Sequence, residues 1–526
     1  MVAVRLADWL ARRAASDGPR LAVVAGDARW SFAELDRRAS ATARRLVALG
    51  VRPGDRVALL LPNGPEWAEL VFGVGRAGGV LVPLNVRLAP AELAWQVGQV
   101  APRLLLHSSA TERLARSALE AVPGAGRDAS AGADGSDGAS RKVPGVQAVM
   151  ALSVEELATV PEGPGTGEPR PVALEEPHSI LFTSGTTGRP KAVVLTYGNL
   201  WWSAVGSALN LGVHRDDRWL ANLPLFHVGG LSILVRSVIY GTAAVVHERF
   251  DPEAANRAVD EEGVTLLSLV ATTLARMLEA RGERRFPPSL RTALVGGGPT
   301  PPVLLERARR LGMPVAPTYG LTEAASQVTT LAPWEAARKP GSSGRPLLPT
   351  EVRIDRDGRP AAPGEIGEIL VRGPTVSPGW LAGPQGPLSP LVDADGWLHT
   401  GDLGHLDDEG YLYVVDRRDD LIVSGGENVY PAEVEAALLS HPAVEEAGVV
   451  GVPDPLWGQV PVAMVRLKPG QDVSPEALVA HCEARLARYK RPRVVRIVEE
   501  PLPRNAAGKL QRHRLRERWD VLRTAG

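Results

Sequence analysis

The segment from Ser179 to Val194, SILFTSGTTGRPKAVV, constrains the fold most because it joins two apolar runs through a short loop of glycines and hydroxyls. Glycines let a backbone approach an anion closely and turn its N–H groups toward it. The hydroxyls add hydrogen-bond donors, and Lys191 adds a positive charge. Few ligands other than a polyphosphate need all three features together. We therefore predict that this loop binds a polyphosphate.

The loop differs from the phosphate-binding loop G-x-x-x-x-G-K-[ST]. Pro190 stands at the position that the second glycine of that motif would occupy. The alternative for this stretch is a Gly/Ser/Thr-rich hairpin turn with no ligand. The stretch by itself leaves both interpretations open, so the rest of the chain has to decide between them.

Composition limits the partners and the compartment. With 526 residues the chain is too long for one core, and its net charge of -1 creates no field that favours nucleic acid or an anionic membrane. Cys482 is the only cysteine, which fits a reducing compartment. The N-terminus predicts an amphipathic helix with Leu6, Trp9 and Leu10 on one side, not a signal peptide, and no stretch reaches the ~18 uninterrupted apolar residues of a membrane span. We expect a cytoplasmic protein with no nucleic-acid partner and no membrane span.

Helical and strand-like patterns alternate near the N-terminus. Residues 32–49 predict an amphipathic helix, and the apolar run 56–61 is typical of a buried parallel strand. A second helix is expected from about Pro65 to Arg76, followed by a strand over 80–84. Strand–helix–strand units of this length indicate an α/β layer with a parallel sheet.

The same alternation resumes from Ser179 to about residue 415. Residues 243–247, 266–270 and 292–295 predict further strands. The short runs 352–354 and 369–371, separated by glycine-containing turns, predict a small β subdomain. The fold class that follows is α/β with an added α+β part.

Two interruptions divide the chain. The charged stretch 416–420 separates an N-terminal domain, residues 1–415, from a C-terminal α+β domain, residues 416–526. Residues 108–176 are interpreted as a Gly/Ala-rich insert, because their central part (122–140) is too poor in apolar side chains to fold by itself.

Four further clusters have the composition of a nucleotide site. Residues 296–299 (GGGP) follow an apolar run, where an α/β sheet receives a flat ligand. Residues 318–323 (TYGLTE) offer an aromatic face and a carboxylate that could hold Mg²⁺. The carboxylate of residues 400–402 (TGD) suits ribose hydroxyls, and residues 505–509 (NAAGK) place a lysine after a flexible turn. Each cluster alone is also compatible with an ordinary turn or a solvated side chain.

Taken together and in order, these segments resemble the adenylate-forming superfamily of acyl-CoA synthetases, firefly-type luciferases and stand-alone adenylation domains. The matching motifs are LFTSGTTGRPKAVV, TYGLTEAAS, WLHTGDLG, DRRDDLIVSGGENVYPAEVE and PRNAAGKLQR, and the similarity extends from about residue 5 to residue 520. The resemblance implies a large N-terminal AMP-binding domain of parallel-sheet α/β subdomains with a small β subdomain. It also implies a small, mobile C-terminal α+β domain.

Within the superfamily the chain is similar to the o-succinylbenzoate–CoA ligases of menaquinone biosynthesis. The matching stretches are residues 196–212, 223–241, 340–346 and 448–460. This similarity implies a Mg²⁺-dependent ligase that activates o-succinylbenzoate with ATP to an acyl-adenylate and transfers it to CoA. The alternatives are a synthetase for another aryl or medium-chain acid, a carrier-loading adenylation domain, and a non-catalytic nucleotide sensor.

The resemblance also implies a role for each matching residue. ATP and AMP would be bound by Thr183, Ser184, Gly185, Thr186, Thr187, Gly188, Lys191, Gly297, Gly298, Pro299, Thr318, Tyr319, Gly320, Thr322, Asp402, Arg417 and Lys509. Magnesium would be held near Thr186 and Glu323, and the chemistry would involve Lys509, Lys191, Thr322 and His227. The small domain would rotate about Asp419 and bring Ser424, Gly425 and Gly426 to the CoA tunnel.

For the acyl group the expected contacts are His227, Ser232 and Arg236. The substrate would carry a second, unreacted carboxylate, and a buried anion needs a cationic or multiple-donor partner. Arg236 interrupts an apolar run and is the candidate for that partner, the alternative being an arginine that bridges two helices. Gly229 stands where related sequences often have a serine, so no hydroxyl contact is expected there.

Overall fold

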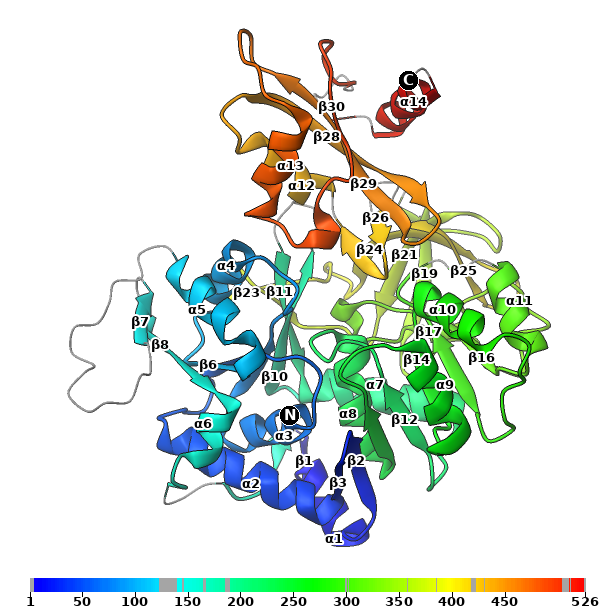
Figure 1. Cartoon of the computed structure of the whole chain (residues 1–526). Coiled ribbons are helices and arrows are strands. Elements are labelled where there is room, and N and C mark those ends of the chain that lie inside the picture. The colour runs from blue at the N-terminus through cyan, green and yellow to red at the C-terminus, as the bar shows by residue number, and fades with distance from the viewer. Residues whose placement is uncertain are drawn as a thin grey trace.

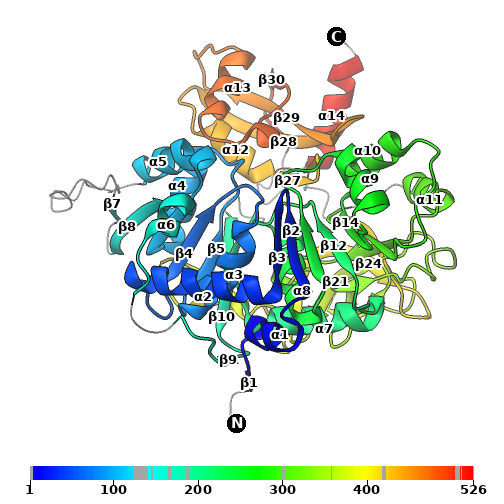
Figure 2. The same cartoon turned by 60° about the horizontal axis from the view of Figure 1, so that its bottom comes forward.

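The computed structural model describes residues 4–122, 140–143, 146–163, 167–184, 190–298, 300, 302–356, 358–384, 386–417, 422–429, 431–503, 510 and 512–524. Three sheets build the large N-terminal part, and a smaller sheet with its own helices lies above them (Figure 1). The view in Figure 2 shows the first sheet and its helices beside the second. This architecture confirms the predicted fold class.

The first sheet has nine strands in the described chain, and its central strands β5, β4, β6 and β8 are parallel. In spatial order the strands are β23 (Leu388–Ser389), β22 (Gly379–Leu381), β11 (Pro190–Thr196), β10 (Pro177–Ser184), β5 (Val80–Pro83), β4 (Arg56–Leu60), β6 (Leu104–His107), β8 (Val146–Ser153) and β7 (Ser140–Val143).

The second sheet also has nine strands among the described residues, most of them parallel. In spatial order they are β18 (Arg345–Pro346), β17 (Thr329–Thr330), β16 (Val315–Tyr319), β15 (Thr292–Val295), β14 (Leu266–Leu269), β12 (Arg218–Ala221), β13 (Ala243–Val246), β2 (Leu21–Ala25) and β3 (Ala28–Ser31). Strands β1 (Arg5–Leu6) and β9 (Val172–Ala173) form a separate pair.

Helices cover both faces of each large sheet, which is why the strand sequences are continuous apolar runs. In β4, Val57 and Leu59 belong to the core shared by the two sheets, whereas Ala58 and Leu60 face the opposite side. The shared core contains residues of α1 (Trp9–Asp17), α2 (Phe32–Ala48), α3 (Glu66–Arg76), α7 (Tyr197–Leu211) and α8 (Val228–Tyr240). The outer faces are covered by α4 (Pro90–Val100) and α5 (Glu112–Glu120) on the first sheet and by α9 (Pro252–Glu261), α10 (Ala271–Arg281) and α11 (Pro302–Arg310) on the second.

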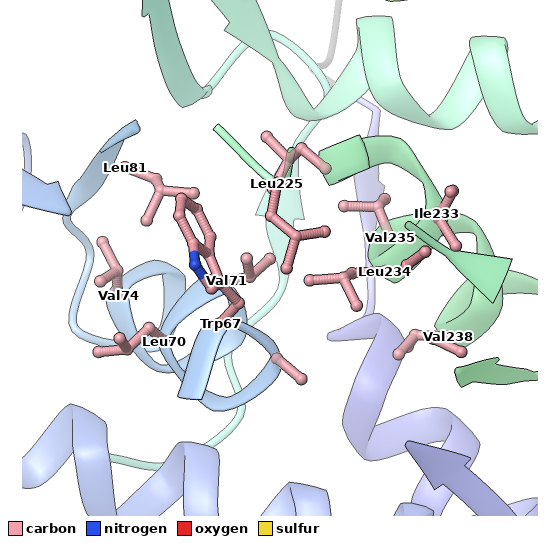
Figure 3. Packing of buried hydrophobic residues seen from close by; sticks show 14 of the residues in the cluster. Trp67, Leu70, Val71, Val74, Leu81, Leu225, Ile233, Leu234, Val235 and Val238 are labelled. Carbon is pink, nitrogen blue, oxygen red and sulfur yellow. The ribbon is translucent and has the colours of Figure 1, made fainter. Parts of the chain in front are cut away.

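Trp67 of α3 is, with Trp219 of β12, one of the two largest fully buried side chains of the core shared by the two sheets (Figure 3). Its indole Nε1 donates to the carbonyl of Pro62 at 2.7 Å, so the buried polar atom is satisfied. Leu225 and the α8 residues Leu234 and Val235 belong to the same cluster. The two sheets therefore share one continuous core, which fixes the position of α8 beside the first sheet.

The third sheet is antiparallel and matches the predicted β subdomain. Its order is β20 (Arg359–Pro360), β19 (Glu351–Arg356), β21 (Gly367–Arg372), β24 (Leu398–Leu406) and β25 (Leu412–Arg417). Apolar residues of its inner face, among them Ile354, Ile369 and Leu398, pack around Tyr319 of the second sheet. This contact ties the subdomain to the strand that carries the TYGLTE cluster.

The small domain has a sheet buried on both faces. The strands are β27 (Glu427–Val429), β26 (Ile422–Ser424), β29 (Gly458–Leu467), β28 (Val444–Asp454) and β30 (Val495–Ile497). Val449 and Val465 face a cluster that includes α12 (Pro431–Leu439) and α13 (Pro475–Glu483), and Val450 and Met464 face α14 (Arg512–Thr524). The unit therefore has its own hydrophobic core.

The interpretation of residues 108–176 as an insert is wrong for much of its length. Strand β8 pairs in parallel with β6, and α5 buries Ala115, Ala118 and Leu119 against the first sheet. Helix α6 (Val154–Thr159) follows directly. Residues 123–139, the most Gly- and Ala-rich part, lie outside the described residues. The composition of that central part hid the short apolar segments on either side of it.

No helix in the described part of the chain is long and apolar enough to cross a bilayer.

A buried histidine beside the N-terminal helix makes the stability of the protein depend on pH. His178 is 4% exposed, its ring lies 4.9 Å from that of Tyr197, and burial lowers the pKa of His178 to about 4. Unfolding restores an ordinary pKa near 6.5, so the unfolded chain binds a proton that the folded chain does not as pH falls below that value. Between pH 7 and pH 5 this should cost about 2 kcal/mol of stability.

We expect His178→Phe, which keeps an aromatic ring in this cluster, to remove that part of the pH dependence. The difference in Tm between pH 7 and pH 5, measured by calorimetry, should be smaller for the variant than for the wild type. The exposed His214, substituted as His214→Gln, serves as the control. Equal shifts in all three proteins would contradict the assignment.

Candidate active site

A cavity of about 1260 Å³ lies where the three large-domain sheets and the small domain meet. Residues at the carboxyl ends of strands line it, as expected for a ligand site in an α/β sheet. Its walls include Thr183, Lys191, His227, Arg236, Gly296, Gly297, Thr318, Gly320, Thr322, Glu323, Asp402, Gly425, Gly426 and Glu427. Most of the described residues that the sequence predicted for the site are therefore brought together.

The glycine- and hydroxyl-rich segment forms a β-hairpin at the edge of this cavity. β10 and β11 pair antiparallel, with Thr183 opposite Lys191. The Thr183 hydroxyl donates to Oε1 of Glu323 at 3.1 Å, and Lys191 Nζ lies 5.7 Å from the ring centre of Trp380. The segment thus forms the hairpin that was the alternative to a polyphosphate-binding loop. The same hairpin places Thr183 and Lys191 on the cavity wall, so hairpin geometry and polyphosphate binding are compatible.

Close contacts explain two glycines in the part of the cavity predicted to bind the nucleotide. A Cβ atom on Gly320 would lie 1.6 Å from the carbonyl oxygen of Ser326, which leaves no room for a side chain. A Cβ on Gly296 would lie 2.7 Å from Cγ2 of Thr318. The Thr318 hydroxyl donates to the carbonyl of Thr329 at 2.7 Å, so it already has a partner within the fold.

Tyr319 and Asp402 form a buried pair that the sequence did not indicate. The Tyr319 hydroxyl donates to Oδ2 of Asp402 at 2.8 Å. Tyr319 is buried and is absent from the cavity wall, whereas Asp402 lines it. The position of Tyr319 therefore does not support a ring stacked on a ligand. Gly298 likewise does not reach the wall, although Gly297 does.

The predicted ribose-binding pair lies on adjacent strands. Asp402 of β24 is directly opposite Arg417 of β25 in the antiparallel register. Beside Asp402, the Gly401 N–H donates to Oε1 of Glu368 at 2.8 Å, and His399 lies between Glu368 and Asp393 at 3.3 and 3.2 Å. This network fixes the part of β24 that presents the Asp402 carboxylate.

The small domain closes one side of the cavity with Gly425, Gly426 and Glu427. Both glycines have positive φ, and a Cβ on Gly425 would lie 2.6 Å from the ring of Trp457. A Cβ on Gly426 would lie 3.0 Å from Cγ2 of Val270 on the large domain. Both positions therefore require glycine, because the backbone has positive φ and because neighbouring side chains leave no room for a Cβ atom. Ser424 is buried and does not reach the cavity.

Glu427 connects the small domain to the large domain by charge. Its Oε2 lies 3.2 Å from Nε2 of His227, and its Oε1 forms an ion pair with Arg87. Burial alone raises the pKa of Glu427, but the charge and hydrogen bond of His227, together with Arg87 and Lys490, outweigh burial and lower that pKa to about 2. Glu427 is therefore a carboxylate throughout the neutral range.

The part of the cavity predicted to receive the acyl group contains a buried cation. Arg236 of α8 is 3% exposed, its Nη2 donates to Oγ of Ser203 on α7 at 2.9 Å, and burial lowers its pKa. Among the described residues its Nε has no hydrogen-bond partner. The arginine thus bridges two helices and also lines the cavity. Ser232 does not line it, because that side chain is buried and donates to the carbonyl of Gly229 at 3.2 Å.

Asn222 and Gln327 add polar atoms to the same cavity, and the sequence did not point to either. Both amide atoms of Asn222 and Oε1 of Gln327 are buried without a partner in the described part of the chain. Asn222 directly follows β12, and a polar residue at the carboxyl end of a strand could have been predicted from the sequence to line the ligand site. Gln327 follows an irregular turn and had no such signal.

Several predicted residues cannot be placed. Gly185, Thr186, Thr187, Gly188, Pro299, Asp419 and Lys509 lie outside the described residues, as does the side chain of Arg417. Their roles in phosphate binding, magnesium binding, adenine binding, hinge motion and catalysis stay predictions.

Known proteins resemble the chain over most of its length. The chain matches the AMP-binding enzyme family over residues 10–381 and the AMP-binding enzyme C-terminal domain over residues 433–509. It is 48% identical to 2-succinylbenzoate–CoA ligase of Geobacillus kaustophilus, over 97% of each chain.

Two structures of o-succinylbenzoate CoA synthetase from Bacillus subtilis are also similar. A double mutant bound to the product analogue OSB-NCoA is 41% identical, with a TM-score of 0.87 over 98% of this chain and 99% of that chain. The complex with the acyl-adenylate intermediate OSB-AMP is 40% identical, with a TM-score of 0.70 over 97% of this chain and 98% of that chain.

The extent of these matches shows that the chain belongs to the AMP-binding enzyme family.

Proposed function

We propose that the protein is an acid–thiol ligase that activates 2-succinylbenzoate with ATP and transfers the acyl group to CoA. The products are o-succinylbenzoyl-CoA, AMP and pyrophosphate, as in menaquinone biosynthesis. Relatives that are 41–48% identical over nearly the whole chain carry the name of this ligase. The relatives support the substrate, and the acyl end of the cavity gives it a physical basis.

The observation that carries the substrate is Arg236. 2-Succinylbenzoate has two carboxylates, and one of them stays unreacted inside the protein. An isolated charge is costly to bury unless it is paired and hydrogen-bonded. Arg236 lines the cavity with a buried positive charge, and its Nε has no hydrogen-bond partner in the described part of the chain. Asn222 lines the same cavity and carries amide donors. A pocket for a simple fatty acid would have no need of these groups.

The first step is attack of the substrate carboxylate on the α-phosphate of ATP. Two anions must approach each other, so alignment and neutralisation of charge matter more than acid–base groups. Lys191 and Asp402 line the cavity. Lys191 would neutralise phosphate charge, and Asp402 would accept hydrogen bonds from ribose hydroxyls. Lys509, the lysine of the NAAGK cluster, would bridge the α-phosphate and the attacking carboxylate.

The carboxylate of Glu323, 3.1 Å from the Thr183 hydroxyl at the cavity wall, fits a hard cation that prefers oxygen ligands. Magnesium bound there with ATP would supply further neutralisation of the phosphates. Thr186 is the second predicted contact to this ion.

The second step is displacement of AMP by the thiol of CoA, and the present arrangement of the domains suits it. The TM-scores of 0.87 and 0.70 belong to two structures of a B. subtilis synthetase that cover nearly the same share of this chain. We infer that the difference reflects conformation, because both structures are of the same synthetase, and this structure is more similar to the one with the product analogue. In it Gly425 and Gly426 lie at the cavity, where they would leave room for a narrow pantetheine chain. Rotation of the small domain about a hinge near Asp419 would convert this arrangement into the one for adenylate formation.

Substrate-dependent exchange of pyrophosphate into ATP tests the proposal. We expect rapid exchange with 2-succinylbenzoate, exchange slower by at least about tenfold with benzoate or octanoate because neither offers a second carboxylate to the buried arginine, and thioester formation with free CoA. Absence of exchange with 2-succinylbenzoate would remove the proposal. Exchange without transfer to free CoA would favour a carrier-loading adenylation domain.

A further inference from the structure

Glu92, on the large domain, receives hydrogen bonds from the small domain although it lies outside the cavity wall. It occupies the first turn of α4, where its Oε2 accepts from the backbone N–H of Ala89 at 2.9 Å. The same Oε2 accepts from the N–H of Ala487 at 2.8 Å, and its Oε1 accepts from Nζ of Lys490 at 2.8 Å. One carboxylate therefore caps a helix of one domain and binds two groups of the other.

Lys490 is a buried cation between two carboxylates. Its side chain is 6% exposed, and its Nζ lies 2.8 Å from Glu92 and 2.8 Å from Glu433 of α12. Burial, with a contribution from Glu92, raises the pKa of Glu433 to about 7 despite the charge of Lys490. Removing the lysine would leave two buried carboxylates facing each other, which is strongly unfavourable.

Other contacts between the domains gather on the same segment. We call residues 85–92 of the large domain the docking segment. Asn85 lies 3.5 Å from the hydroxyl of Tyr489, Arg87 pairs with Glu427, and the apolar side chain of Ala487 packs into the core beside α4. Glu92 makes two hydrogen bonds of 2.8 Å to the small domain, one with the N–H of Ala487 and one with Nζ of Lys490.

We propose that Glu92 is a positioning residue that holds the small domain in the thioester-forming arrangement through Lys490 and the N–H of Ala487. The inference rests on the proposed two-step function, because Glu92 and Lys490 can meet only while the small domain lies against the docking segment. Rotation for adenylate formation separates them. Glu92 thereby favours the second step without touching substrate, ATP or CoA.

The test measures the two half-reactions separately in Glu92→Gln, Lys490→Met and the double variant. Thioester formation from supplied acyl-adenylate and CoA should slow about tenfold in Glu92→Gln, which keeps the acceptor for Ala487 but loses the charge, and about a hundredfold in Lys490→Met. Pyrophosphate exchange should stay within about twofold of the wild type in Glu92→Gln, because that substitution leaves the first-step site unchanged. The double variant should transfer faster than Lys490→Met, since the glutamine relieves the repulsion between carboxylates.

Glu156→Gln is the matched control, because Glu156 caps α6 in the same way and lies far from the small domain. Its half-reactions and Tm should equal those of the wild type. Equal loss of both half-reactions in Glu92→Gln, no loss in either, or a double variant slower than Lys490→Met would overturn the role of Glu92. A wild type that fails to exchange pyrophosphate with 2-succinylbenzoate refutes the proposed function instead, and the two failures are therefore distinguishable.

Discussion

Replacing Lys509 with alanine is expected to abolish adenylate formation and to leave thioester formation from a supplied acyl-adenylate nearly intact. The lysine would contribute its charge where the carboxylate attacks the α-phosphate, and loss of one such group costs about 10²–10³-fold or more in rate. In the second step the negative phosphate leaves with AMP, and in the arrangement proposed for that step Gly425 and Gly426 of the small domain line the cavity.

Pyrophosphate exchange and single-turnover thioester formation measure the two steps. Lys468→Ala is the control, because Lys468 is also on the small domain and its Nζ donates to the carbonyl of Pro442 at the surface. Equal loss of both half-reactions in Lys509→Ala would contradict the assignment of one small-domain orientation to each step.

Replacing Arg236 with methionine is expected to lower kcat/KM for 2-succinylbenzoate by about 10²–10³-fold, because the unreacted carboxylate would be buried without its cation. A monocarboxylate analogue that keeps the reacting carboxylate should lose far less. Arg236→Lys should recover part of the activity, since it restores the charge but not the planar set of donors.

The contact between Arg236 and Ser203 requires a control for packing. Ser203→Ala removes the bridge between α7 and α8 and leaves the cation in place. It should therefore lower Tm and leave the preference for 2-succinylbenzoate over the monocarboxylate nearly unchanged. If Arg236→Met reduced activity toward both acids equally, the arginine would be structural and its assignment to the carboxylate would be wrong.

The sequence determined most of the local architecture. Helix α2 and strand β4 appear within one residue of the predicted ends, because amphipathic periodicity and continuous apolar runs are local properties of the chain. Motif composition likewise identified Thr183, Lys191, Glu323 and Asp402, all of which line one cavity. Hydroxyls, a lysine and carboxylates near glycines are chemically specific before the fold is known.

Other properties depended on contacts between distant parts of the chain. β8 was missed because a Gly/Ala-rich stretch precedes it, and its place in the sheet comes from its pairing with β6. Tyr319 turns to Asp402 and Ser232 to Gly229, and these choices depend on packing that no local pattern encodes.

The position of the small domain is the clearest case. Glu427 meets His227 and Lys490 meets Glu92 across 200 and 398 residues. A sequence pattern reports which side chains carry charge, but not which charges face each other, because that depends on how the two domains dock. The sequence by itself therefore determined the chemistry of the chain. The tertiary structure decided which charged side chains of the two domains meet.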